Sequence, residues 1–227
     1  PDIKAIISTI GGDDSIRMLP YIDLNIIRDN PKIFLGYSDT TVSHFICMAA
    51  GLRSFYGPAI MAGFGENGGL FPYMKDSVYR TLCTTEIIGE VKPNLDGWTA
   101  EQADWGNIEN QKTKRPLTPN KGPKILQGKG KATGHLIGGC VEVLEMLKGT
   151  SVWPKDDIWN NAILFLEISE DLPTNSQFTY FMRNYAATGI LHRLSGIIMG
   201  RPPFDTQNLD KIEIYDQALQ QVVREEE

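Results

Sequence analysis

The residues Gly36-Tyr37-Ser38-Asp39-Thr40 place a serine between a short apolar run and a helix-like segment. On a sharp strand-to-helix turn, a serine hydroxyl is exposed, and the N–H group of the next residue points into the same space. The helix N-terminus adds partial positive charge where an oxyanion would form. The spacing therefore makes Ser38 a candidate nucleophile. The alternative is that Ser38 or Asp39 is a helix N-cap, and Thr40 stands where such a turn usually has glycine.

Gly11-Gly12 follows the β-branched run at 3–10. A glycine pair there can present free N–H groups to an anion or to a carbonyl oxygen. It can equally serve a turn that needs positive φ.

Glu167 lies inside the apolar run 162–168. An unpaired carboxylate is costly to bury, so Glu167 needs a partner, such as a histidine that it would orient. The alternative is a solvated carboxylate at the end of a strand, or one that meets Arg183 or Arg201.

The chain has three histidines, His44, His135 and His192, and none has the spacing of a metal ligand. His44 lies six residues after Ser38, on the predicted helix that follows it, and is expected to point away from the turn. We predict no metal site, and we assign none of the three as a catalytic base.

Two glycine patterns do not support a cofactor. Residues 63–68 match GxGxxG, but the strand before them is weak and Pro72 follows closely. Residues 128–134 lack the GK[ST] of a phosphate-binding loop. No cofactor is predicted.

Strands and helices alternate along the chain, which is typical of a parallel α/β layer. The segment 92–124 is polar, rich in Pro and Asn, and contains Trp98 and Trp105. We interpret it as an inter-domain linker or a long functional loop. Strands are expected at 3–10, 32–37, 87–91, within 125–139, at 162–168 and at 196–200. Helices are expected from Asp14 or Ser15 toward Pro20, from Asp23 to about 30, and at 40–50, 71–84, 140–148, 176–187 and 209–226.

Composition narrows the functional classes. The 227 residues carry a net charge of −6, which disfavours nucleic acid as a partner. No apolar run is long enough to span a membrane. Three distant cysteines favour reduced thiols and a cytoplasmic location.

Six segments together resemble the LD-carboxypeptidase family of serine peptidases, and most closely its microcin C immunity branch. They occur in the order and at the spacing of that family and cover nearly the whole chain. They are IISTIGGDDSIRMLPYID (6–23), PKIFLGYSDTT (31–41), FYGPAIMAGFGENGG (55–69), GHLIGG (134–139), LFLEISED (164–171) and GIIMGRP (196–202).

The resemblance implies a parallel α/β domain with the nucleophile elbow at 1–92, a linker or substrate loop at 93–124, and a β-rich α/β domain at 125–227. It implies a homodimer and a metal-free Ser-His-Glu triad. The family histidine is expected beyond residue 227, and a further segment before residue 1.

Carried over to this sequence, Ser38 is the nucleophile, Glu167 is the triad acid, and N–H groups near Gly12 and Asp39 hold the oxyanion. Two positions depart from the family, Cys140 and Ile168, where Asn and Asp are frequent.

The substrate implied by the resemblance is a small peptide or a peptidyl- or aminoacyl-nucleotide. Trp105 would stack on the base, with Trp98 as second choice, and packing between the domains is the alternative role for either. Two other functions stay open. One is a murein tetrapeptide LD-carboxypeptidase, and the other is a protein that binds a peptidyl-nucleotide without cleaving it.

Overall fold

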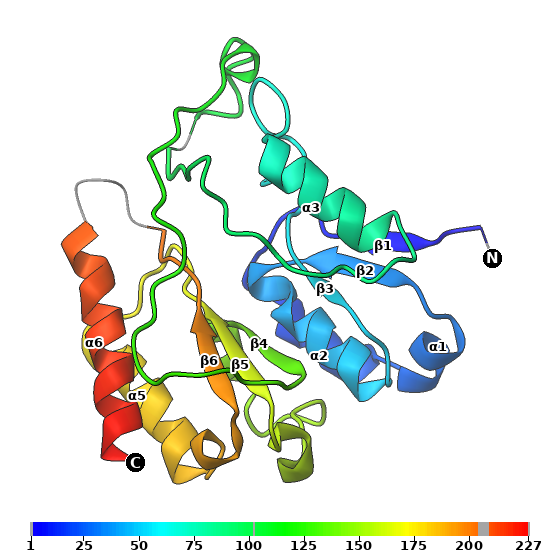
Figure 1. Ribbon diagram of the computed structural model, residues 1–227. Helices are drawn as coiled ribbons and strands as arrows, with labels where there is room; N and C mark the ends of the chain where they lie inside the picture. Colours follow the sequence, from blue (N-terminus) through cyan, green and yellow to red (C-terminus); the bar gives the residue numbers. More distant parts are fainter. Residues whose placement is uncertain (1, 102, 204–208, 227) are drawn as a thin grey trace.

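The computed structural model describes residues 2–101, 103–203 and 209–226, which form two three-stranded parallel sheets (Figure 1). The strands are β1 (Ala5–Ile7), β2 (Ile33–Gly36), β3 (Phe55–Tyr56), β4 (Leu136–Cys140), β5 (Ile163–Glu167) and β6 (Gly196–Met199). The helices are α1 (Leu24–Asp29), α2 (Thr41–Ala49), α3 (Pro72–Leu82), α4 (Val141–Leu147), α5 (Asn175–Ala187) and α6 (Leu209–Glu225). Short 3₁₀ helices cover Ser15–Tyr21, Ser38–Thr40, Asn110–Lys112, Asp156–Trp159 and Leu191–Arg193. The predicted α/β class is confirmed.

The first sheet has the order β1-β2-β3, with Ile6 opposite Phe34 and Leu35 opposite Phe55. β1 is shorter than the expected strand at 3–10, because the chain leaves the sheet before the glycine pair. β3 was not predicted, since two residues carry too little periodicity to stand out.

The second sheet has the order β4-β5-β6, joined by the crossover helices α4 and α5. Its register pairs Gly138 with Phe165. A Cβ atom on Gly138 would lie 1.8 Å from the Phe165 carbonyl oxygen, and the φ angle of Gly138 is +156°. Glycine is therefore required where β4 approaches β5.

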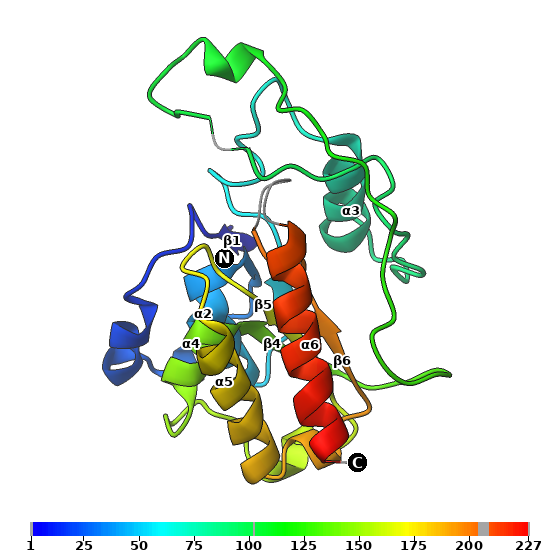
Figure 2. The ribbon, with the colours of Figure 1, turned by 90° about the vertical axis from the view of Figure 1, so that its left-hand side faces the viewer.

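One apolar core joins α2, the helix that follows the first sheet, to the second sheet. Val42, Phe45 and Ile46 on α2 belong to the same buried cluster as α4, β4, β5, α5 and α6. Figure 2 shows α5 and α6 lying along the second sheet, with α2 beside α4. Because α2 begins directly after Ser38–Thr40, the core fixes the position of the predicted nucleophile.

α3 and the segment 93–124 rise above the two sheets (Figures 1 and 2). The strand expected at 87–91 is wrong: Ile87 is almost fully exposed, and Gly89 has φ +68°, which breaks an extended backbone. A β-branched run without a neighbouring strand has no partner for its backbone groups.

Within the described ranges, no helix has both the length and the hydropathy needed to cross a membrane. The side chains described there form no cluster suited to a metal ion. Cys47, Cys83 and Cys140 are free thiols.

Candidate active site

Ser38 lies at the junction of β2 and the 3₁₀ helix that leads into α2. Its φ angle is +59°, in the left-handed region that non-glycine residues rarely adopt. Such strain is typical of functional turns, and here it turns the serine out of the chain's path. Neither this 3₁₀ helix nor α2 is capped by a side chain, so the N-cap alternative does not describe Ser38 or Asp39.

Two glycines allow the close packing around this turn. A Cβ atom on Gly36 would lie 2.6 Å from the hydroxyls of Ser8 and Thr40. One on Gly11 would lie 2.9 Å from the Ser38 hydroxyl oxygen. The glycine pair that follows β1 therefore lies directly against the candidate nucleophile.

Asp39 directs its side chain away from the pocket. Its carboxylate is buried at 3% exposure, and Oδ2 accepts hydrogen bonds from the Ser15 backbone N–H (3.0 Å) and hydroxyl (2.6 Å). A Cβ atom on Gly12 would lie 3.3 Å from the same oxygen. Asp39 thus ties the glycine turn to the elbow. Its own N–H group lies in the first turn of a helix, where N–H groups lack an intrahelical partner.

Glu167 is the last residue of β5, and its carboxylate reaches across to the first sheet. Its Oε2 atom accepts hydrogen bonds from the Tyr56 hydroxyl and from the Ser38 backbone N–H (3.4 Å). Burial raises the pKa of Glu167, and these hydrogen bonds act in the opposite direction. Arg183 instead pairs with Glu225, and Arg201 lies over the Trp98 ring, so the proposed arginine partners are wrong.

Two hydroxyl residues that the sequence did not single out complete this junction. Tyr56 accepts a hydrogen bond from the Ser38 N–H (2.9 Å). The Thr41 hydroxyl donates to the Ser38 carbonyl (2.7 Å) and accepts from the Cys140 N–H (3.0 Å). The sequence carried no signal for Tyr56, because its two-residue strand β3 could not be predicted.

The three histidines lie elsewhere. His44 is buried, and its ring nitrogens contact the Gly36 carbonyl (3.0 Å) and the Ser54 hydroxyl (2.8 Å). Burial lowers the pKa of His44 to about 4. His135 contacts the Ile158 carbonyl, and His192 pairs with Glu226. None of the three lines the pocket that contains Ser38.

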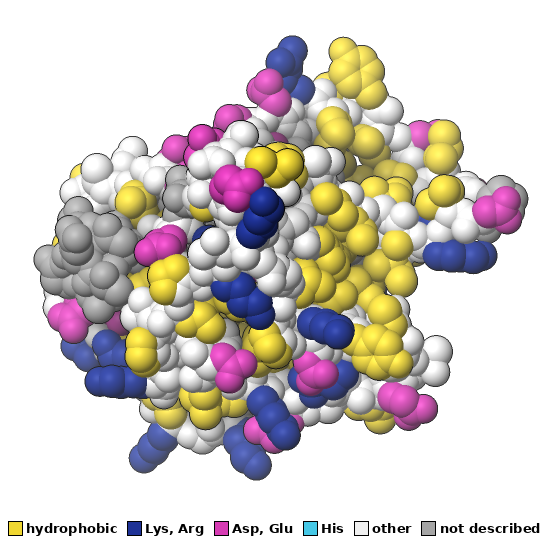
Figure 3. Space-filling model, turned by 90° about the horizontal axis from the view of Figure 1, so that it is seen from above, with side chains coloured by type: hydrophobic (Ala, Val, Ile, Leu, Met, Phe, Trp, Pro, Cys, Tyr) yellow, Lys and Arg dark blue, Asp and Glu magenta, His cyan; other side chains and the backbone are white. Residues whose placement is uncertain are grey.

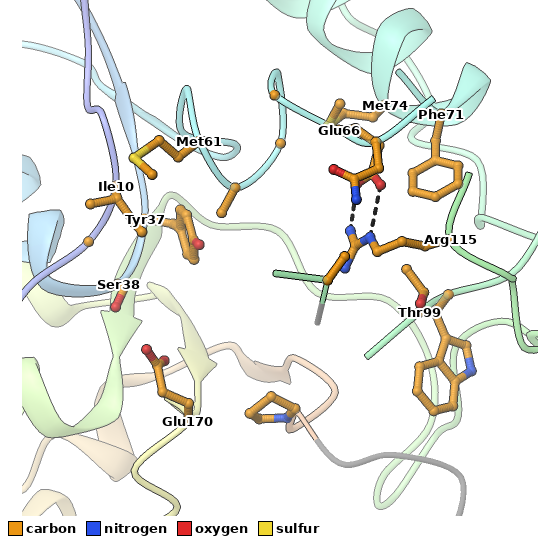
Figure 4. A pocket seen from close by; sticks show the side chains of 18 of the residues that line it. Ile10, Tyr37, Ser38, Met61, Glu66, Phe71, Met74, Thr99, Arg115 and Glu170 are labelled. Carbon is orange, nitrogen blue, oxygen red and sulfur yellow. Dashed lines mark hydrogen bonds and ion pairs between the residues drawn. The ribbon is translucent and has the colours of Figure 1, made fainter. Parts of the chain in front are cut away.

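A pocket of about 1000 Å³ opens at Ser38. Gly12, Ser38 and Glu167 line one side, and Trp98, Trp105 and Arg115 line another. Figure 4 shows Ser38 and Glu170 on the side of the two sheets, and Glu66 with Arg115 on the opposite side. The face seen from above is hollowed where hydrophobic side chains gather (Figure 3). The larger apolar side chains of the lining are Ile10, Met61, Phe71, Met74, Trp98, Trp105, Leu117 and Ile168.

An ion pair holds the upper wall of this pocket. Arg115 donates from Nε and Nη2 to the two carboxylate oxygens of Glu66, at 2.8 and 2.5 Å (Figure 4). The Glu66 side chain is only 4% exposed, and Arg115 also donates to the Glu101 carbonyl. This bidentate pair joins the glycine-rich loop after β3 to the segment 93–124.

The two tryptophans of that segment differ in their surroundings. Trp98 pairs its backbone with Thr118 and lies under the Arg201 guanidinium, 4.7 Å from the ring centroid. Trp105 is 53% exposed. Trp98 is therefore fixed by protein contacts, whereas Trp105 presents free ring surface.

Comparison with known proteins gives a consistent family. The profile of the LD-carboxypeptidase N-terminal domain matches residues 1–57, and that of the C-terminal domain matches residues 133–227. The chain is 36% identical to the microcin C7 self-immunity protein MccF of Escherichia coli over 203 residues, which cover 88% of this chain and 57% of that protein. It is 30% identical over 173 residues to a Bacillus subtilis protein named a probable murein peptide carboxypeptidase, covering 76% and 44%. The chain thus spans about half the length of these relatives.

Solved structures agree. An MccF-like protein from Streptococcus pneumoniae in complex with AMP superposes with a TM-score of 0.86 at 29% identity, over 98% of this chain and 68% of that one. MccF in complex with aspartyl sulfamoyl adenosine gives 0.82 at 31% identity, over 100% and 66%. The chain belongs to the LD-carboxypeptidase family, in its MccF-like branch.

Proposed function

We propose that this chain carries the nucleophile and the acid of a serine carboxypeptidase that cleaves the amide bond of a peptidyl- or aminoacyl-nucleotide of the microcin C type. The observation that carries the proposal is the placement of Ser38. Its strained turn lies beside the Glu167 carboxylate, in a pocket whose other wall presents an exposed tryptophan. Self-immunity or detoxification is the role that fits this chemistry.

In the proposed mechanism, the Ser38 hydroxyl oxygen attacks the acyl carbonyl carbon while a histidine removes its proton. The N–H groups of Gly12 and Asp39 stabilise the oxyanion. Collapse breaks the carbon–nitrogen bond, and the histidine returns the proton to the leaving nitrogen. Water then hydrolyses the acyl ester. Glu167 orients the histidine and stabilises its charged form.

We propose that the histidine of this mechanism is none of the three in this sequence. His44, His135 and His192 each have partners outside the pocket. We therefore propose that the complete protein supplies the base from chain beyond residue 227. We also propose, on the family resemblance, that the complete protein is a cytoplasmic homodimer. Sedimentation of the purified protein measures the oligomeric state.

Trp105 is the proposed stacking platform for the nucleotide base. Stacking of a base on an aromatic ring contributes on the order of 1–3 kcal/mol. Trp98 already lies against Arg201, so it is the second choice. Trp105→Ala should raise KM for a nucleotide substrate about 10-fold or more, with kcat nearly unchanged, and Trp98→Ala should raise it less.

The deciding experiment compares the complete protein with its Ser38→Ala variant. The substrates are an aminoacyl-nucleotide with an amide-type link and a murein tetrapeptide, and products are followed by mass spectrometry. Ser38→Ala should fold normally and lose turnover by several orders of magnitude. Turnover retained by the variant would exclude Ser38 as nucleophile.

The same assay separates the two alternatives. Faster cleavage of the tetrapeptide would favour a murein LD-carboxypeptidase, which the name of the B. subtilis relative suggests. Binding of an intact nucleotide substrate without product, in the unaltered protein, would favour sequestration.

A further inference from the structure

Tyr56 occupies the junction between the elbow and the carboxylate. Its hydroxyl oxygen accepts the Ser38 backbone N–H at 2.9 Å and donates its proton to Glu167 Oε2. Resting on the proposed function, we propose that Tyr56 is a positioning residue of the reaction: it holds the Glu167 carboxylate in register with Ser38. No other side chain of the described segments bonds to both residues.

The direction of these hydrogen bonds is fixed by chemistry. The Ser38 N–H can only donate, so it uses a lone pair of the Tyr56 oxygen, and the single phenolic proton goes to the carboxylate. Burial, and then the charge of Glu167, raise the pKa of Tyr56 far above neutrality. Tyr56 therefore remains a donor wherever the protein is folded.

The surroundings of Glu167 make this donor important. The charged and titratable groups around it are Glu142 on α4, Glu170 after β5, Cys140 at the end of β4 and Tyr37 before the elbow. Glu142 and Glu170 raise the pKa of Glu167, and Glu167 forms no ion pair in the part of the chain described. The Tyr56 hydroxyl and the Ser38 N–H are the groups that stabilise its charge.

Geometry leaves room for the triad histidine. Both hydrogen bonds reach Oε2, whereas Oε1 accepts none from a described side chain. Tyr56 can thus fix the plane of the carboxylate through one oxygen while the other meets the imidazole. A carboxylate without this anchor would be free to rotate, and misplacement of a catalytic group by about 1 Å can cost about 100-fold in rate.

The test is Tyr56→Phe in the complete protein, with Tyr185→Phe as the matched control. Tyr185 is fully buried in the apolar core, whereas Tyr56 is half-buried, and the Tyr185 hydroxyl has no hydrogen-bond partner among the described residues. Tyr56→Phe should lower kcat by about 10- to 100-fold and change KM less than about twofold. Tyr185→Phe should leave both constants unchanged.

A pH profile separates positioning from a general structural effect. The Tyr56 hydrogen bond lowers the pKa of Glu167, so its loss raises that pKa. The acid limb of kcat/KM reports the histidine base, whose charged form Glu167 stabilises. A Glu167 carboxylate that is misplaced or more easily protonated stabilises the imidazolium less, so the acid limb should move to lower pH in Tyr56→Phe. A loss of kcat with an unmoved acid limb would overturn the proposal, as would unchanged kcat.

Two further measurements keep the test independent of folding and of substrate choice. If Tyr56 acts through Glu167, then Tyr56→Phe combined with Glu167→Gln should be no slower than Glu167→Gln alone. Additive losses would contradict the proposal. The Glu167 carboxyl, titrated by ¹³C NMR and assigned with Glu167→Gln, should show a higher pKa in Tyr56→Phe. This readout needs no turnover, so it decides the role of Tyr56 even if the unaltered protein cleaves no substrate and the proposed function fails.

Discussion

Acidification should destabilise the fold through His44. This ring is 8% exposed, and burial lowers its pKa from 6.5 to about 4. The unfolded chain binds a proton below about pH 6.5, whereas the folded protein binds it only near pH 4. Stability is therefore intact above pH 6.5 and falls progressively as the pH drops to about 4. Each unit of difference between the pKa values of His44 in the unfolded and folded states is worth about 1.4 kcal/mol. The free energy of unfolding should therefore fall by roughly 3 kcal/mol.

Urea unfolding of the complete protein at pH 7, 5.5 and 4, followed by tryptophan fluorescence, measures this loss. Trp153 stacks on Phe45 of α2, so the emission reports on the helix that carries His44. The His44→Gln variant keeps a donor for the Gly36 carbonyl but has no titrating ring. Between pH 7 and 4, its free energy of unfolding should therefore fall by about 3 kcal/mol less than that of the unaltered protein. His192→Gln, which removes an exposed histidine, is the reference. Equal losses in His44→Gln and in the unaltered protein would refute the reasoning.

Three further substitutions probe the junction and the pocket wall. Gly139→Ala places a Cβ atom 2.5 Å from the Thr41 side chain at a φ of +150°; we expect a Tm several degrees lower, and an unchanged Tm would contradict this contact. Thr41→Val leaves the Cys140 N–H without its acceptor and should cost about 1–3 kcal/mol in urea unfolding, whereas Thr41→Ser should cost less. Arg115→Met leaves Glu66 buried and unpaired, so we expect about 3 kcal/mol of destabilisation in urea unfolding at pH 7; Arg115→Met combined with Glu66→Gln should recover most of it.

The sequence predicted the parts of the fold that depend on local pattern. Apolar runs gave β2, β5 and β6, and Asp23 does cap α1 through its side chain. The expected strand at 87–91 failed because a strand needs a neighbour as well as a pattern. β3 was missed for the opposite reason: two residues form a strand only because β2 lies beside them.

The sequence likewise predicted only those residues of the candidate site that stand out locally. Ser38 and Glu167 were visible because each is an anomaly, a serine on a sharp turn and a carboxylate in an apolar strand. Family resemblance then assigned their roles. Tyr56 and Thr41 carry no such signal, since tyrosine in a strand and threonine at a helix start are ordinary. Their importance depends on the second sheet, which lies far away in the sequence.

The arrangement suggests why the core and the chemistry are coupled in this protein. Ser38 directly follows β2 of the first sheet and Glu167 ends β5 of the second, so neither sheet alone can bring them together. The apolar face of α2 packs into the core of the second sheet, while the Thr41 hydroxyl bonds to both the Ser38 carbonyl and the Cys140 N–H. A change that loosens α2 would therefore separate the proposed nucleophile from the proposed triad acid before it unfolds either sheet. Activity should consequently respond to mutations in this contact more steeply than global stability does.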